Sequence, residues 1–553
     1  MVPTPEASGS RRYPIGVEFL HCSDGSTRAH ARVWAPDCQL VELVTDPGLE
    51  AFSLSPEGNG YHSVLLQNAS PVLRYKYRLD GRGPFPDPAS RSQPMGPHGP
   101  SRMIDPAQYQ WGDTAWRGVA IEGQVFSEIH VGTFTKAGTF RAAIERLPEL
   151  VDVGITVIEV MPIADFPGRF GWGYDGVNLF APSHLYGTPD DFRAFVDAAH
   201  RLGLGVILDV VYNHFGPDGN YLREFSSHYL GARPTEWGDA PNFDGPECGP
   251  VRELIVSNAR YWIDEFHLDG LRLDATQQIF DASTRHIIAE IGDAVRAAGD
   301  EAGRRVIIVA ESEPQDTRLV RRADQGGYGL DAVWNDDFHH AACVAVTGRD
   351  EAYYSGYRGT PQELISAAKY GYLYQGQWFT WQGHRRGSPG LDLEPTNFIA
   401  FIQNHDQVAN SGFGRRLHQE TSPGRYRALT ALLLLLPQTP LLFQGQEFAA
   451  STPFYYFADH KAELAGSVRS GRTDFVSQFP SIAANDARER VLDPADPRTF
   501  SRSKLDWTER SDHAEALALH RDLLALRRKD PVLRAQRRRG LDGAVIGESA
   551  FVI

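Results

Sequence analysis

Four apolar segments of the chain carry acidic or basic residues where they end. GVILDVVYN contains Asp209, LDGLRLDA contains Arg272 and Asp274, RVIIVAES contains Glu311, and FIAFIQNHD ends at Asp406. A single charge after a strand is usually solvated, but four segments that end in this way would gather several charges around one rim. We therefore predict a site built from carboxylates at the ends of these segments.

The spacing of these residues predicts two different protonation states. In a strand, residues two apart share a face, so Arg272 and Asp274 lie together while the two flanking leucines take the other face. A neighbouring arginine favours the ionised carboxylate, so we expect a lowered pKa for Asp274. Glu311 follows the apolar run Val306–Ala310, which is expected to raise its pKa. One ionised and one protonated carboxyl, about 5 Å apart, form the pair that retaining glycoside hydrolysis requires.

These segments belong to a series of apolar runs separated by amphipathic stretches. Near-continuous apolar runs are typical of parallel strands buried on both faces. Between the second and third runs, Thr188 and Pro189 predict the start of a helix that Gly203 ends. Eight strands alternating with helices predict an α/β fold, a (β/α)8 TIM barrel. The runs are residues 125–131, 156–163, 205–213, 268–275, 305–312, 331–338, 398–406 and 440–447.

Three regions are expected along the 553-residue chain. Short β-runs between turns over residues 13–106 predict an N-terminal immunoglobulin-like β-sandwich. Residues 107–465 are expected to form the barrel. Residues 466–553 are expected to begin with a polar, loop-like stretch to about 505 and to continue with a helix over 513–528 and one or two short strands. Residues 1–12 are expected to be disordered.

Composition and charge exclude several classes of protein. Apolar residues make up 42% of the chain, enough for a sizeable core, and the net charge of −15 argues against nucleic-acid binding. Without an apolar secretory signal or a run long enough to span a bilayer, the chain is expected to be cytoplasmic, with no membrane partner. The four cysteines form no C-x-x-C pair, so zinc is not expected. They are expected to be free thiols, with a Cys22–Cys38 pair as the alternative.

The segments around the carboxylates resemble the four signature regions of the α-amylase family of glycoside hydrolases. They are DVVYNH (209–214), DGLRLDA (269–275), AES (310–312) and QNHDQ (403–407), in the family's order. The resemblance implies that Asp274 is the nucleophile and Glu311 the acid/base. It also implies that Asp406 is the third carboxylate, which stabilises the transition state, and that Asp209 holds Arg272.

The same resemblance implies a set of sugar contacts. Tyr174, in GWGYDG, would be the stacking platform of the cleavage subsite, where His214, Arg272 and His405 would contact the sugar. The windows 272–277, 336–340 and 405–410 would line the substrate site. Besides residues already named, they contribute Leu273, Ala275, Thr276, Gln277, Asp336, Asp337, Phe338, His339, His340, Gln407, Val408, Ala409 and Asn410.

No cofactor and no metal are expected. The adjacent His339 and His340 point to different sides, and no carboxylate spacing completes a zinc site around them. Asn213 and its neighbours could hold calcium, but no oxygen-rich cluster requires it.

Further stretches resemble one branch of the family, the maltooligosyltrehalose trehalohydrolases. They include EIHVGTFTKAGTF (128–140), WNDDFHH (334–340) and LLFQGQEFAASTPFYYFADH (441–460). This implies hydrolysis of the α-1,4 bond next to the terminal trehalose of maltooligosyl trehalose, with a maltooligosyltrehalose synthase as functional partner. It also implies a C-terminal β-domain, which in this chain is truncated or missing.

Two other functions remain open. One is a glycogen-branching or debranching enzyme on the same scaffold, which the catalytic regions alone fit equally well. The other is a non-catalytic relative that serves as a binding subunit. That function would need at least one of the carboxylates to be replaced, and none is.

Overall fold

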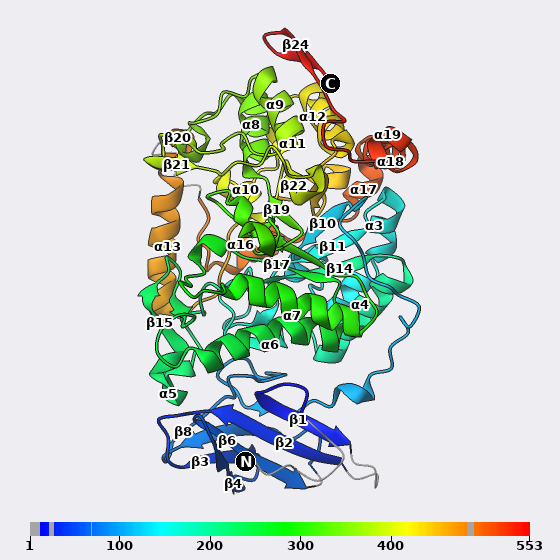
Figure 1. The fold of residues 1–553 in the computed structure, drawn as a ribbon. Helices are drawn as coiled ribbons and strands as arrows, with labels where there is room; N and C mark the ends of the chain where they lie inside the picture. Colours follow the sequence, from blue (N-terminus) through cyan, green and yellow to red (C-terminus); the bar gives the residue numbers. More distant parts are fainter. Residues whose placement is uncertain (1–10, 22–26, 68, 484–490) are drawn as a thin grey trace.

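The computed structural model describes residues 11–21, 27–67, 69–483 and 491–553. Small β-sheets from the first hundred residues pack against one side of a closed barrel surrounded by helices, and the C-terminal hairpin lies at the opposite end of the molecule (Figure 1). Of the residues expected to be disordered, only 11 and 12 are described. Arg11 is ordered, because its guanidinium donates to the carbonyls of Gly16 (2.8 Å) and His30 (2.6 Å). Cys38, Cys248 and Cys343 are free, and Cys22 lies outside the described residues.

The N-terminal region consists of two sheets over one apolar core. One has the strand order β1-β2-β6-β5, and the other β4-β3-β7-β8, with β9 paired to β7. Trp34 and Tyr77 are buried, and their rings contact Tyr229 and Phe225 of the barrel region. Ser226 of the barrel region donates a 2.9 Å hydrogen bond to Asp37 and so helps to attach the sheets. The strands are β1 Gly16–His21, β2 Thr27–Trp34, β3 Val41–Asp46, β4 Ala51–Ser53, β5 Ser55–Gly58, β6 Tyr61–Gln67, β7 Arg74–Leu79, β8 Arg82–Phe85 and β9 Ser101–Arg102.

All eight predicted barrel strands are present and close into one parallel barrel, so the predicted TIM barrel is confirmed. Each strand pairs with the next one in the series, and the last returns to the first. The strands are β10 Phe126–Ile129, β11 Val157–Val160, β14 Gly205–Val210, β17 Gly270–Leu273, β18 Ile307–Ala310, β19 Ala332–Trp334, β22 Phe398–Phe401 and β23 Thr439–Phe443.

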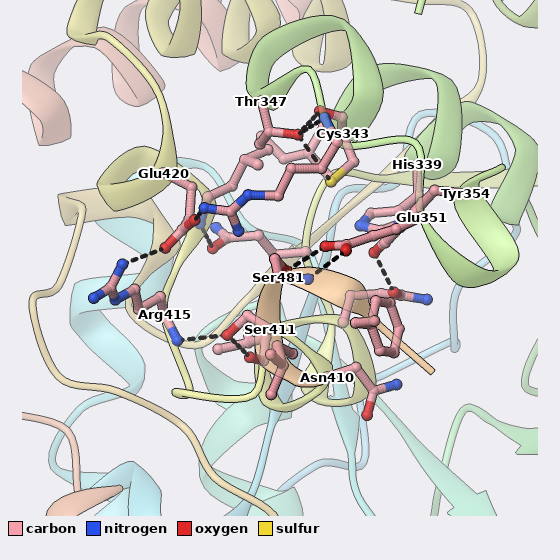
Figure 2. A pocket seen from close by; sticks show the side chains of 18 residues that line it. His339, Cys343, Thr347, Glu351, Tyr354, Asn410, Ser411, Arg415, Glu420 and Ser481 are labelled. Atoms are coloured by element: carbon pink, nitrogen blue, oxygen red, sulfur yellow. Dashed lines mark hydrogen bonds and ion pairs between the residues drawn. The ribbon is translucent and has the colours of Figure 1, made fainter. Parts of the chain in front are cut away.

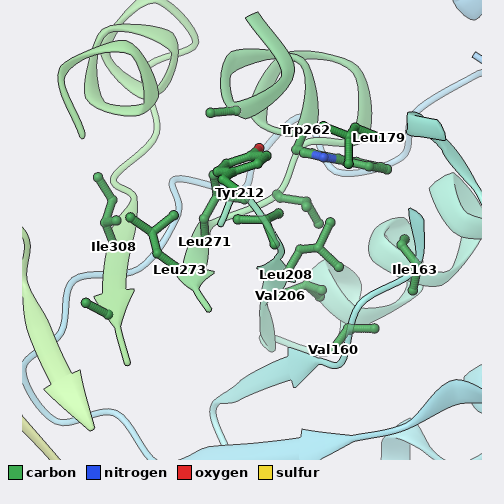
Figure 3. Packing of buried hydrophobic residues seen from close by; sticks show 14 of the residues in the cluster. Val160, Ile163, Leu179, Val206, Leu208, Tyr212, Trp262, Leu271, Leu273 and Ile308 are labelled. Atoms are coloured by element: carbon green, nitrogen blue, oxygen red, sulfur yellow. The ribbon is translucent and has the colours of Figure 1, made fainter. Parts of the chain in front are cut away.

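Alternation along β17 places its leucines and its arginine on opposite faces. Leu271 and Leu273 pack outward into the large core between strands and helices (Figure 3), while Arg272 between them is fully buried and contacts Asp274, as predicted. Gly270 starts this strand with φ +151°, and a Cβ there would lie 1.8 Å from the carbonyl oxygen of Ile307. Only a glycine at this position allows β17 and β18 to approach each other closely enough to pair.

Helices cover the barrel and connect its strands. The predicted start of α4 is confirmed, because Thr188 and Asp191 form a capping box. The helices are α1 Val131–Phe134, α2 Phe140–Ile144, α3 Leu147–Val153, α4 Pro189–Arg201, α5 Leu222–Phe225, α6 Gly249–Phe266, α7 Ile287–Glu301, α8 Asp336–Thr347, α9 Pro361–Tyr370, α10 His405–Asn410, α11 Leu417–Glu420, α12 Pro423–Leu435, α13 Ala462–Val476, α14 Pro480–Ala483, α16 Pro497–Arg502, α17 Glu509–Asp512, α18 Ala514–Lys529 and α19 Pro531–Arg534.

The stretch expected to be loop-like after residue 466 is partly helical, so that prediction was wrong. Helix α13 runs over 15 residues, and Val476 is its one buried residue. The sequence shows no clear apolar stripe because this helix lies on the surface. The predicted helix over 513–528 is confirmed as α18, and the chain ends in the hairpin of β24 (Ala544–Gly547) and β25 (Ala550–Val552).

Shorter strands form hairpins outside the barrel. They are β12 Ala164–Asp165 with β13 Asn178–Pro182, β15 Leu230–Pro234 with β16 Asp239–Pro241, and β20 Gln377–Phe379 with β21 His384–Arg386. Within the described residues, no helix has the length and apolar character needed to cross a bilayer.

Candidate active site

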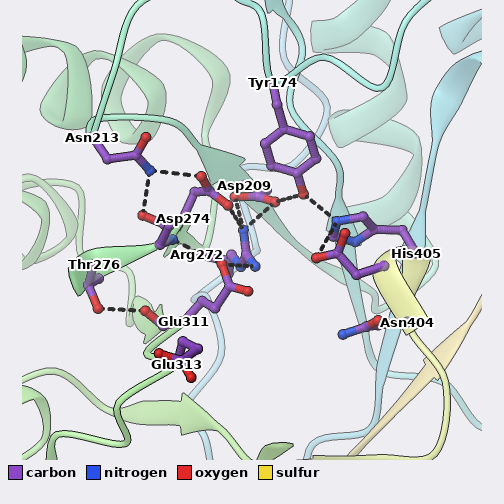
Figure 4. Close-up of polar contacts among 12 residues, drawn as sticks. Tyr174, Asp209, Asn213, Arg272, Asp274, Thr276, Glu311, Glu313, Asn404 and His405 are labelled. Carbon is purple, nitrogen blue, oxygen red and sulfur yellow. Dashed lines mark hydrogen bonds and ion pairs between the residues drawn. The ribbon is translucent and has the colours of Figure 1, made fainter. Parts of the chain in front are cut away.

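Arg272 lies at the centre of the carboxylate cluster (Figure 4). Its Nη1 donates to both carboxylate oxygens of Asp209 (2.8 and 2.7 Å) and to Asp274 Oδ1 (2.8 Å). Its Nη2 lies 2.8 Å from Glu311 Oε2. The guanidinium carbon also lies 4.1 Å from the ring centroid of Trp334, which closes the barrel beneath it. One buried cation therefore fixes three carboxyl groups that come from three adjacent strands.

Asp274 is the most tightly held carboxyl of the predicted pair. Asn213 Nδ2 donates to Asp274 Oδ2 at 2.8 Å, in addition to the contact from Arg272. Burial raises the pKa of Asp274, and Arg272 and the hydrogen bond from Asn213 oppose that rise. The expected net lowering by Arg272 was therefore wrong: the arginine acts in the expected direction, but removal of the carboxyl from water outweighs it.

Glu311 has the raised pKa that the sequence predicts. Burial, together with the nearby charges of Asp274 and Asp406, raises the pKa of Glu311 to about 7, although Arg272 opposes this. The backbone N–H of Ala275 donates to Glu311 Oε2 at 2.9 Å. Ala275 has φ +37°, a strained left-handed conformation that turns the chain after β17 toward Glu311.

Asp406 lies across the site at the start of α10, which Asn404 caps. Its side chain is 41% exposed, the most open of the three predicted carboxylates. His405 Nε2 lies 3.4 Å from Asp406, while Glu128 accepts from His405 Nδ1 at 2.5 Å. Burial favours the neutral imidazole, but Asp406 and Glu128 raise the pKa of His405 to about 9. The ring is therefore a fixed cation beside Asp406.

Tyr174 connects the two sides of the site. Its hydroxyl donates to Asp209 Oδ2 at 2.7 Å and lies 3.0 Å from His405 Nε2. Its ring stacks on His405 with centroids 5.3 Å apart. On the far side of Asp274, burial lowers the pKa of His214 to about 4, so this imidazole is neutral at pH 7. His214 hydrogen-bonds Asn213.

The window at the start of α8 divides into a buried part and a part near the site. Asp337 is fully buried and accepts hydrogen bonds from the backbone of Leu373 and Tyr374 and from the Tyr357 hydroxyl. It therefore holds a loop. Burial raises the pKa of Asp336 to about 8, with the charge of Glu311 adding to the rise.

Several predicted sugar contacts lie behind the site instead of facing it. Leu273 and Phe338 pack into the outer core, and Val408 and Ala409 pack under the site. His339 and Asn410 line a cavity of about 60 Å³ behind α10, next to Cys343 and Glu420 (Figure 2). That volume is far below the range of 300–1,000 Å³ typical of ligand sites. It is too small for a sugar.

Of the remaining window residues, Thr276, Gln277 and Gln407 contact the loops that carry the carboxylates, whereas His340 does not. Thr276 Oγ1 donates to the carbonyl of Glu311 at 2.5 Å. The backbone N–H of Glu313 donates a hydrogen bond to Gln277 Oε1 at 3.4 Å. Gln407 accepts from Tyr353 at 2.9 Å. His340 is buried among the rings of three tyrosines.

Four charged residues of the site were not predicted. Arg386, only 2% exposed in its side chain, donates to Glu313 at 2.7 Å. Arg472 of α13 donates to Asn410 Oδ1 and the Ala409 carbonyl, both at 2.8 Å. Glu128 and Glu159 face each other on β10 and β11, and burial raises the pKa of Glu159 well above its usual value. The two glutamates could have been predicted as site residues, because each is an acidic residue within an apolar strand. The two arginines could not, because they come from segments without a distinctive sequence pattern.

The arrangement can perform a double displacement at an acetal carbon. A carboxylate held by Arg272 and Asn213 can attack, and a neighbouring carboxylic acid with a pKa of about 7 can protonate the leaving oxygen. Among the described residues, no group of three or more His, Cys, Asp or Glu side chains is arranged to hold a metal ion.

Comparison with known proteins gives one consistent result. The model of the alpha amylase catalytic domain matches residues 106–239. The malto-oligosyltrehalose trehalohydrolase of Deinococcus radiodurans is 42% identical over 561 residues, covering 100% of this chain and 90% of the relative. That of Arthrobacter ramosus is also 42% identical, covering 90% and 87%. A 1,4-alpha-glucan branching enzyme of Streptomyces coelicolor is 28% identical, covering 84% and 65%.

Solved structures agree on the architecture. A crystal structure of a Salmonella typhimurium protein proposed to be an alpha amylase superposes with a TM-score of 0.88 at 40% identity, covering 97% of this chain and 90% of that one. A Bacillus subtilis pullulanase superposes with a TM-score of 0.70 at 18% identity, covering 98% and 76%. The pullulanase shares the fold alone.

Proposed function

The chain belongs to the malto-oligosyltrehalose trehalohydrolases of the α-amylase family, and from this we propose that it hydrolyses maltooligosyl trehalose. The bond cleaved is the α-1,4 bond next to the terminal trehalose, and the products are trehalose and a maltooligosaccharide. The observation that carries the proposal is the full-length identity of 42% to an enzyme of that name, set against 28% to a branching enzyme.

In the proposed mechanism, Asp274 attacks the anomeric carbon on the non-trehalose side of the bond. Glu311 donates its proton to the glycosidic oxygen, trehalose leaves, and a covalent glycosyl–Asp274 ester forms. Glu311, now ionised, removes a proton from water, which attacks the same carbon and breaks the ester. Two inversions give net retention, and Glu311 ends protonated as it began.

The contacts of the two carboxyls support this division of roles. Asp274 receives two side-chain hydrogen bonds that stabilise its anion, from Arg272 and Asn213, and these suit a nucleophile. Glu311 has a pKa of about 7, which suits a group that must donate and then accept a proton near neutral pH. Asp406, beside the cationic His405, is the proposed stabiliser of positive charge at the anomeric carbon.

Substrate recognition is proposed for the side chains that border this cluster. Tyr174, His214 and His405 would contact the ring at the cleavage position, and Gln277, Asp336 and Gln407 would contact the sugars beside it. A maltooligosyltrehalose synthase, which forms the terminal trehalose, is the functional partner that this proposal requires to supply the substrate.

A comparison of two substrates of similar length tests the proposed specificity. Trehalose has an α,α-1,1 link, which places its hydroxyls differently from those of maltose, so polar groups matched to it are left unpaired by maltose at about 1–3 kcal/mol each. We predict that kcat/KM for maltotriosyl trehalose exceeds that for maltopentaose by about a thousandfold, the effect of two or three such losses. Equal values, measured by product chromatography, would instead indicate a general α-glucan hydrolase.

A further inference from the structure

The hairpin β20–β21 carries an indole for which the proposed mechanism has no role. The hairpin is inserted between α9 and β22, in the long connection that follows the sixth barrel strand. Figure 1 shows it above α13 at one side of the barrel. Trp381, in the turn of this hairpin, is 41% exposed. An indole ring in this position has a large, flat apolar face that can pack against a ligand.

Polar contacts fix the hairpin to the loop that carries Glu311. Gln382, next to Trp381, donates to Glu313, and Arg386 at the end of the hairpin donates to the same carboxylate at 2.7 Å. Glu313 follows Glu311 by two residues. Arg386 is almost completely buried, so these contacts attach the hairpin to the loop after β18 through a group that is shielded from water.

Ring contacts fix Trp381 to the loop that carries Asp406. Its ring packs edge-on against Tyr353, with centroids 6.0 Å apart. The Tyr353 hydroxyl donates to Gln407 at 2.9 Å, and Gln407 follows Asp406 directly in α10. Trp381 therefore lies on the rim between the loops that carry Glu311 and Asp406.

Alternation in the hairpin separates Trp381 from a second exposed indole. Side chains at successive strand positions point to opposite faces. Phe379 is buried, and its ring lies beside that of Trp381 in the turn, with centroids 6.4 Å apart. Trp378 precedes Phe379, pairs with Arg385 across the hairpin and is 61% exposed. It lies on the opposite face and offers a matched control.

We propose that Trp381 is a stacking platform for the glucan part of the substrate, forming a subsite beyond the ring that is cleaved. The proposal rests on the proposed function and extends it to the recognition of chain length. An aromatic ring that stacks on a pyranose contacts its apolar face and few of its hydroxyls. It therefore suits a repeating α-1,4-glucan, whereas the trehalose end must be distinguished through its hydroxyls.

Kinetics with substrates of different length test the platform. We compare glucosyl trehalose, which has one glucose before the cleaved bond, with maltotriosyl trehalose, which has three. In Trp381→Ala, the ratio of kcat/KM for the longer substrate to that for the shorter one should fall about tenfold, the effect of losing one well-packed aromatic anchor. Trp381→Phe should give an intermediate ratio, and Trp378→Ala should give the wild-type ratio.

An equal loss with both substrates in Trp381→Ala would overturn the proposal, because it would indicate a contact at the trehalose end or a structural role. A fall in Trp378→Ala as large as in Trp381→Ala would overturn it as well. Thermal unfolding midpoints of the three variants show whether each one is folded.

Calorimetric binding of maltohexaose to the Glu311→Gln protein separates this proposal from the proposed function. Adding Trp381→Ala should weaken the binding about tenfold, whether or not the wild type releases trehalose. Unchanged binding would contradict the platform. A wild type that binds maltohexaose through Trp381 but releases no trehalose would contradict the proposed function alone.

Discussion

Arg272 contacts three buried carboxyl groups, and the other partners of these groups differ. Asp209 receives both Nη1 contacts and the Tyr174 hydroxyl. Asp274 receives Arg272 and an amide. Glu311 receives a single backbone N–H besides the guanidinium and lies near two other carboxylates. Burial and these two negative charges raise the pKa of Glu311 to about 7, although Arg272 opposes the rise.

Asp274→Asn should abolish turnover without unfolding the protein. The substitution keeps the volume and removes the nucleophile, and Arg272 retains Asp209 and Glu311 as partners. We expect kcat to fall by at least about a thousandfold. The measurement is single-turnover hydrolysis of maltotriosyl trehalose, with circular dichroism as the control for folding. A folded variant with more than a few per cent of wild-type activity would exclude Asp274 as the nucleophile.

Glu311 should set the alkaline limb of the pH profile. The acid step needs its protonated form, so kcat/KM should fall as the pH rises through about 7. The acid limb should report Asp274, whose ionised form is lost as the pH falls, and its raised pKa moves this loss to higher pH than for an exposed aspartate.

Glu311→Gln should remove the alkaline limb and retain activity only on substrates with an activated leaving group, such as a glucosyl fluoride, which needs no proton. Profiles of kcat/KM on both substrates for the wild type and the variant make the test. An alkaline limb that survives the substitution would assign the proton donor to another residue.

At the scale of elements, α13 is held against α10 mainly by one side chain. Arg472 donates to the last turn of α10, which begins at His405 and Asp406. Because α13 buries so little apolar surface, these two charge-assisted hydrogen bonds are expected to be important for holding α13 against the end of α10.

Arg472→Ala should therefore lower kcat about tenfold while the unfolding midpoint changes little, because the helix it releases lies on the surface. Guanidinium ion added to the solution should restore part of the activity by occupying the vacated position. Arg469→Ala, on the same helix but paired with Asp493, is the control and should behave as wild type. If Arg472→Ala loses stability and is not rescued, the side chain is structural only.

Helix α8 shows where prediction from the sequence reached its limit. The sixth apolar run was expected to extend through residue 338, but β19 ends at Trp334 and the window 336–340 forms the first turn and a half of α8, whose residues point in several directions. Asp337 consequently holds the 373–374 loop, and His340 is buried among tyrosines. Alanine at either position is expected to destabilise the loop or the core, so neither is a clean probe of specificity.

At the scale of the whole molecule, the barrel was predictable because its strands are buried on both faces and so form apolar runs. The central carboxylates were predictable because they end those runs, as Asp274 and Glu311 do. Arg386 and Arg472 were not predictable, because each reaches the site from a hairpin or a surface helix that has no periodic pattern. The net rise in the pKa of Asp274 also required the structure, since burial cannot be read from a neighbouring arginine.

Proton NMR of the wild-type reaction tests the central claim most directly, because it reports the products and the stereochemistry together. With maltotriosyl trehalose, the account predicts free trehalose and maltotriose whose new reducing end appears first as the α-anomer, before mutarotation. Retention requires the ester on a carboxylate that Asp274 is proposed to form. Release of the β-anomer first, or of maltose with no trehalose, would contradict the account.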